Sequence, residues 1–134
     1  MKRSILLSLI CLFASVVMAQ TIVNDHVEVM YFHGKQRCVT CKAIERYARE
    51  VVDKTYATEK KKGKVVFKVV DISTKEGKKI AKDYSVSWSS LYVNGWKGGK
   101  ENRNDMTQFA FKNARNNSEE FKKGIRSKIK ELLK

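Results

Sequence analysis

Segments with the periodicity of β-strands alternate with amphipathic helical segments along this chain, and the alternation limits its fold more than any other feature. The strand-like segments, rich in β-branched and aromatic residues, are 26–32, 64–72, 90–93 and, less regularly, 97–102. The amphipathic segments are 39–56, 74–84 and 118–133. This order predicts an α/β fold of one domain, with a central mixed sheet flanked by helices.

The residue content of these segments also predicts how the strands are arranged. Residues 64–72 are almost continuously apolar, which is typical of a strand covered on both faces, so we expect this strand in the middle of the sheet. Asn94-Gly95 is a strong signal for a two-residue hairpin turn. Gly98-Gly99 adds a second flexible point. Residues 106–116 fit a strand or a helix, and we expect them to lengthen the connection into the last helix, which Ser118 would cap.

The first nineteen residues have the layout of a secretory signal peptide. A short positive region at 2–3 precedes an apolar core at 5–17, and Ala19 is a small residue at the expected cleavage point. The apolar run is shorter than the roughly 20 residues that a membrane-spanning helix needs, so we expect no stable membrane insertion after cleavage. The sequence thus predicts an exported protein, periplasmic or secreted, with signal peptide 1–19 and one domain at 20–134.

Removal of the signal peptide, which contains Cys11, leaves two cysteines, Cys38 and Cys41. Disulfides persist in exported proteins, but a bridge across two intervening residues removes little entropy from the unfolded chain. A reactive pair is therefore a better interpretation than a structural staple. At the start of the predicted helix this spacing places both sulfurs on one face, within reach of a disulfide.

The start of a helix favours an anionic sulfur, because its amide groups are unpaired and its dipole is positive there. Lys35, Arg37 and Lys42 add positive charge that acts in the same direction. We therefore expect Cys38 to be a thiolate that attacks the disulfide of a partner. Cys41, one turn further in, would then resolve the mixed disulfide, and the pair would need no cofactor.

These residues, in this order of elements, resemble the thioredoxin superfamily over most of residues 20–134. The run Tyr31-Phe32-His33-Gly34, followed by Arg37-Cys38-Val39-Thr40-Cys41, is similar to small exported thioredoxin-like proteins of Bacteroides-type bacteria. The resemblance implies a thioredoxin-like three-layer sandwich. It also implies a thiol-disulfide oxidoreductase whose partner is a protein dithiol or disulfide.

The chain departs from that family at the cis-proline that faces the cysteines, because it contains no proline. Residues 84–93 are similar to this region, and Ser90 or Ser89 stands at the place of the proline. A cis bond before any other residue costs about 2.5–4 kcal/mol, which favours a trans peptide and an altered substrate groove. Trp88 beside these serines is either a substrate contact or a core side chain.

A second departure concerns the buried acid that the family carries on its first core strand. Met30 and Tyr31 stand at that place in this chain. Proton transfer from Cys41 would then use another group, and the candidates are His33, a lysine and water. His33 either tunes the cysteine pair or makes only local hydrogen bonds.

Two other functions stay open at this point. Two thiolates with His33 or Ser90 nearby would suit a soft ion such as Cu(I) in a metal-binding thioredoxin-like module. A formal net charge of +14 favours acidic partners, so the fold would also suit a non-catalytic basic binding domain. The lysines are spread along the chain without a nucleic-acid-binding motif, and we interpret them as a solvated basic surface. We therefore favour redox exchange, with no bound metal and no nucleic-acid partner.

Overall fold

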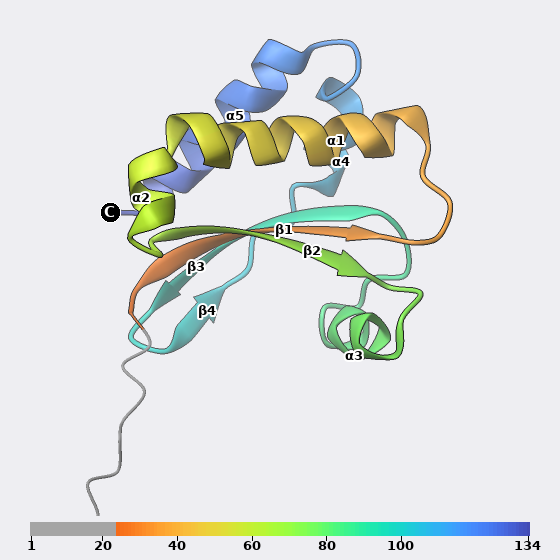
Figure 1. Ribbon diagram of the computed structural model, residues 1–134, viewed down its shortest axis with the longest axis horizontal. Helices are drawn as coiled ribbons and strands as arrows, with labels where there is room; N and C mark the ends of the chain where they lie inside the picture. The colour runs from red at the N-terminus through yellow and green to blue at the C-terminus, as the bar shows by residue number, and fades with distance from the viewer. Residues whose placement is uncertain (1–23) are drawn as a thin grey trace, which may run out of the picture.

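Four strands form one sheet across the middle of the molecule in the computed structural model, which describes residues 24–134 (Figure 1). The predicted signal peptide and Cys11 lie outside the described residues. The strands are β1 (His26–His33), β2 (Val65–Asp71), β3 (Ser90–Lys97) and β4 (Lys100–Asn102). Their order across the sheet is β2-β1-β3-β4, with β1 parallel to β2 and antiparallel to β3. The predicted mixed sheet is confirmed.

Helices cover both faces of this sheet, as Figure 1 shows. The helical elements are α1 (Val39–Glu50), its π-helical continuation η1 (Val51–Thr55), α2 (Ala57–Lys61), α3 (Lys75–Asp83), α4 (Thr107–Asn113) and α5 (Ser118–Leu132). The elements α1, α2, α4 and α5 lie above the sheet in that view, and α3 lies below it. Within residues 24–134, no helix has the length and apolarity needed to cross a membrane.

The central strand β1 divides the core into two clusters. Its residues alternate between the two faces of the sheet, and seven of its eight residues are buried. Val29 and Tyr31 pack in the larger cluster with α1, α4 and α5, whereas Met30 and Phe32 pack in the smaller cluster beside α3. Because β1 is held by neighbours on both edges and both faces, its carboxyl end is a rigid support for the loop that follows.

The prediction that residues 64–72 form the middle of the sheet is wrong, because β2 is an edge strand. Lys68 and Val69 are exposed on it. The helical elements η1, α2 and α3 contact this strand, and a long polar side chain adds to its cover. The Arg49 guanidinium lies 4.7 Å from the centre of the Phe67 ring, and Lys68 forms an ion pair with Glu28 of β1.

The hairpin turn lies at Gly98-Gly99, and the predicted turn at Asn94-Gly95 is wrong. Both Gly98 and Gly99 have a positive φ, of 56° and 76°, which is the conformation that glycine adopts without strain. Asn94 is fully buried inside β3, where its amide nitrogen donates to the Tyr84 hydroxyl at 2.9 Å. Gly95 also remains in the strand, since Leu132 of α5 packs closely against it.

The segment 106–116, which the sequence left between strand and helix, contains α4. Its Phe109 stacks on Phe121 of α5 with ring centres 6.2 Å apart. A side chain at Gly124 would overlap the Phe109 ring, so this glycine lets α4 and α5 approach. Ser118 is the first residue of α5 and Asn117 is its cap, without a side-chain capping bond, so the predicted serine cap is wrong.

Candidate active site

The cysteine pair lies where β1 passes to α1, as the sequence predicted. Cys38 is the N-cap residue of α1, and Cys41 is in its first turn. The two are joined in a disulfide with their Cα atoms 5.0 Å apart. Cys38 is exposed to solvent, whereas only 6% of Cys41 is exposed. One cysteine is therefore accessible to another protein and the other is shielded.

The start of α1 supplies the positive environment that an anionic sulfur needs. The backbone amide of Cys41 donates a hydrogen bond to Cys38 Sγ at 3.0 Å, so the sulfur itself caps the helix. The first turn of α1 contains no acidic residue. Lys35 and Lys42 flank the pair and are exposed. A thiolate at Cys38 would thus gain a direct hydrogen bond and the helix dipole, without an opposing carboxylate in that turn.

Arg37 ties the loop before Cys38 to its surroundings. Its guanidinium forms an ion pair with Glu45 of α1 and donates to Nε2 of His33 at 2.6 Å. Because a guanidinium only donates, Nε2 of His33 accepts, and Nδ1 carries the hydrogen and donates to the Gly34 carbonyl oxygen at 2.9 Å. His33 is buried, with 7% of its surface exposed. Both of its ring nitrogens are therefore engaged locally, and its tuning of the cysteines stays a prediction.

The sequence did not identify Glu45 as part of this site, since its helical position indicated a side chain turned away. In the structure its side chain is only 18% exposed, because Arg37 folds over it. The available signal was its place one helical turn after Cys41, on the same face as the pair. Together, Arg37 and Glu45 link the loop to α1 across the cysteine pair.

The three residues predicted to line a substrate groove lie where a loop enters β3: Trp88 and Ser89 end the loop, and Ser90 is the first residue of the strand. Ser90 is paired in register with Phe32, so this loop reaches the sheet at the same end as the cysteines. Ser89 and Ser90 are buried, and Ser90 Oγ donates to the Trp88 carbonyl oxygen at 3.0 Å. No peptide bond in residues 24–134 is cis, so the Ser89–Ser90 peptide is trans. This geometry is expected, because a cis bond before a residue other than proline is energetically costly.

Trp88 is a surface side chain and not part of the core, with 59% of its area exposed. Its ring leans on Phe111 of α4, with ring centres 5.3 Å apart. An exposed aromatic ring that is held on one side is a ready contact for another protein. Its role as a substrate contact stays a prediction.

Tyr31 of β1 is one of the two residues that the sequence comparison placed where the resembled family carries a buried acid. It is fully buried, and its ring stacks on His33 with centres 5.9 Å apart. Burial raises the pKa of the Tyr31 hydroxyl, and the nearby Ser89 side chain and Arg37 guanidinium offset part of that rise. Within residues 24–134, this hydroxyl has no hydrogen-bond partner of good geometry. Its burial therefore costs stability without a compensating bond.

A Tyr31→Phe variant is expected to be more stable than the native protein by about 1 kcal/mol, because it removes an unpaired buried hydroxyl and keeps the ring. Urea unfolding of the oxidised protein measures the difference. Tyr56→Phe is the matched control, since the Tyr56 hydroxyl donates to the Arg126 carbonyl oxygen at 2.8 Å, and it is expected to lose about 1 kcal/mol. Equal losses in the two variants would show that Tyr31 has a partner after all.

The described residues do not assemble a conventional metal site around the cysteines. Residues 24–134 contain no group of three or more histidine, cysteine, aspartate or glutamate side chains placed to hold a metal ion. The ring nitrogens of His33 are occupied by Arg37 and Gly34, so this histidine does not present a free ligand. A groove of about 420 Å³ near Gly95 and Leu132 lies at the other end of β3 and has no cysteine or histidine in its lining.

Comparison with known proteins gives only structural neighbours. No protein-family model matches the chain. No curated protein matches it in sequence. A solved structure described as that of a malarial protein superposes with a TM-score of 0.52 and 20% identity, covering 81% of this chain and 99% of the other.

Two thioredoxins are also among the neighbours. A thioredoxin from Thermus thermophilus gives a TM-score of 0.48 and 18% identity over 76% of this chain and 72% of its own. Fasciola hepatica thioredoxin gives 0.42 and 24% over 80% of this chain and 81% of its own. The order of the elements, the mixed sheet and the position of the cysteine pair give the chain a thioredoxin-like fold.

Proposed function

We propose that this protein is an exported thiol-disulfide oxidoreductase that exchanges disulfides with other proteins through Cys38 and Cys41. The observation that carries the proposal is the unequal exposure of the two cysteines at the start of α1. An exposed sulfur that caps a helix suits the attacking thiolate, and a shielded sulfur one turn inward suits the resolving thiol. Export rests on the sequence of residues 1–19.

The exchange proceeds in two steps that balance in sulfur bonds and electrons. The Cys38 thiolate attacks one sulfur of a substrate disulfide, which forms a mixed disulfide and releases the first substrate thiolate. Cys41 loses its proton and attacks Cys38 Sγ, which closes the Cys38–Cys41 disulfide and releases the second substrate thiolate. The substrate gains two electrons and the protein loses two, and the same steps in reverse oxidise a substrate dithiol. Neither direction requires a cofactor.

The reduction of insulin by dithiothreitol tests this proposal. The native protein is expected to accelerate the precipitation of insulin chains at a rate proportional to its concentration, because its dithiol is regenerated by dithiothreitol after each turnover. A Cys38→Ser variant is expected to leave the uncatalysed rate unchanged, since it has no accessible nucleophile. If the native protein and this variant gave the same rate, the proposed function would be wrong.

A further inference from the structure

A groove begins beside the cysteine pair, at Val39, and lies between α1 and the segment that follows α4. Its volume is about 250 Å³, and it is lined by Val39, Lys42, Ala43, Arg46 and Tyr47 of α1 and by Arg115 after α4. The α1 positions are spaced by three or four residues and therefore form one continuous stripe. Val39, which stands between the two cysteines, is 66% exposed. A chain bound at Cys38 would therefore continue directly into this groove.

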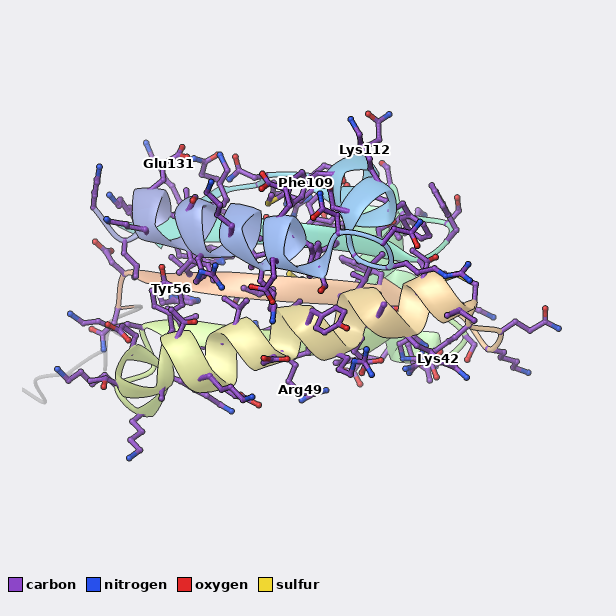
Figure 2. All side chains as sticks on the ribbon, turned by 90° about the horizontal axis from the view of Figure 1, so that it is seen from above. Lys42, Arg49, Tyr56, Phe109, Lys112 and Glu131 are labelled. Atoms are coloured by element: carbon purple, nitrogen blue, oxygen red, sulfur yellow. A yellow bond between two sulfur atoms is a disulfide. The ribbon has the colours of Figure 1, made fainter. Side chains whose placement is uncertain are left out.

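The lining of the groove carries three cations and no carboxylate. Lys42, Arg46 and Arg115 are all exposed, and none of them forms an ion pair with a carboxylate of residues 24–134. The carboxylate of Glu45, on the same helix, is already paired with Arg37. Figure 2 shows Lys42 at the start of α1, at the same end of the molecule as Lys112 of α4. The positive charge of the groove is thus available to a ligand.

Arg46 is held in position before any ligand binds. Its guanidinium lies 4.6 Å from the centre of the Tyr47 ring and donates to the Tyr47 hydroxyl at 2.8 Å. A cation that is fixed in this way loses less conformational entropy when it pairs with a carboxylate. The small side chain of Ala43 leaves room on the floor of the groove, and Val39 and Tyr47 offer apolar contact to the stem of a bound side chain.

We propose that this groove binds an acidic segment of the substrate protein, next to the cysteine that exchanges with Cys38. The inference rests on the proposed function and names the substrate class that this site selects. Along a helix, Lys42 and Arg46 lie about 6 and 12 Å from Cys38, and an extended chain advances about 3.3 Å per residue. The preferred substrates therefore carry carboxylates about two and four residues from the cysteine. Opposite charge in this position accelerates association and favours acidic partners over basic ones.

Symmetric disulfides of short peptides test the inference. Each peptide contains one cysteine, with glutamate, glutamine or lysine at the second and fourth residues on both sides. The rate constant for their reduction by the reduced protein is measured at low ionic strength and in about 1 M salt, where the screening length falls to about 3 Å. The glutamate peptide is expected to react about tenfold faster than the glutamine peptide at low ionic strength, with the lysine peptide slowest. The difference is expected to disappear at high salt.

Two double variants separate the groove from the overall charge. Arg46→Glu with Arg115→Glu is expected to abolish the preference for the glutamate peptide over the glutamine peptide. Lys79→Glu with Lys82→Glu makes the same change in net charge on α3, on the other face of the sheet, and is expected to keep the preference.

Equal rates for the glutamate and glutamine peptides would overturn the inference and leave the proposed function standing. Equal loss of the preference in both double variants would also overturn it, because net charge rather than the groove would then select the substrate. Failure to reduce any of the peptides would instead contradict the proposed function.

Discussion

A Cys41→Ser variant is expected to accumulate as a covalent mixed disulfide with its substrates. Cys38 is exposed and can still attack, but no thiol is left one turn inward to displace the substrate. Cys38→Ser is expected to trap none, because only 6% of Cys41 is exposed to a second protein. Incubation of each variant with an excess of insulin, followed by mass spectrometry without reductant, measures the trapped fraction. We expect nearly all of the Cys41→Ser protein to be trapped, and almost none of the Cys38→Ser protein.

The same experiment separates the two roles of the cysteines. Trapping by Cys38→Ser to the level of Cys41→Ser would show that either sulfur can attack, and the assignment of roles from exposure would be wrong. Treatment of the trapped Cys41→Ser adduct with dithiothreitol is the control, since it should release unmodified insulin chains and identify the link as a disulfide.

A Gly77→Ala variant is expected to lose about 2 kcal/mol or more of unfolding free energy. Gly77 lies in the first turn of α3, where alanine is ordinarily about 1 kcal/mol more favourable than glycine. Here, a Cβ atom would overlap the backbone carbonyl oxygen of Asp71 and lie 2.9 Å from Thr74 Oγ1, which accepts the capping bond from the Gly77 amide. Because the obstacle is backbone, the helix must shift away from β2, and such overpacking outweighs the gain in propensity.

Urea unfolding of the oxidised protein measures this loss. Lys78→Ala is the matched control, since Lys78 is exposed in the same helix and its replacement is expected to change stability by less than about 0.5 kcal/mol. A Gly77→Ala variant as stable as the native protein would show that α3 adjusts freely at the end of β2.

The strands and helices with clear periodicity were predictable from the sequence. The pattern of apolar residues predicted β1 and α3 to within one residue at each end, and Thr74 caps α3 through its hydroxyl. The strand conformation of Asn94-Gly95 was not predictable, because tertiary contacts override the local signal for a turn there. The side chain of Asn94 is satisfied by partners far along the chain, which include the Tyr84 hydroxyl and the backbone amide of Asn104.

The position of 64–72 at the sheet edge was not predictable for a related reason. Its nearly continuous apolar run indicates cover on both faces, but the cover of β2 is only partial: Val69 is 38% exposed, and the Arg49 guanidinium covers the Phe67 ring. Charged residues with long stems hide apolar surface while their charged ends reach polar partners. A hydrophobicity pattern counts such residues as polar and therefore does not reveal that their stems cover apolar surface.

At the site, too, features set by neighbouring residues were predictable from the sequence, whereas contacts between distant residues were not. The pairing of Cys38 with Cys41 follows from a spacing of three residues at a helix start. The contacts of Arg37 with Glu45 and His33 depend on the path of the loop, and Arg115 reaches the groove from a different element. Short-range patterns thus predict the chemistry of the pair, and the fold determines which charges surround it.

The pH dependence of Cys38 alkylation by iodoacetamide in the reduced protein tests the central claim most directly. We predict that the rate reaches half its maximum at a pH well below that of free cysteine in the same buffer, because the start of α1 and its cations stabilise the thiolate. A midpoint at or above that of free cysteine would contradict the claim that Cys38 is an activated nucleophile.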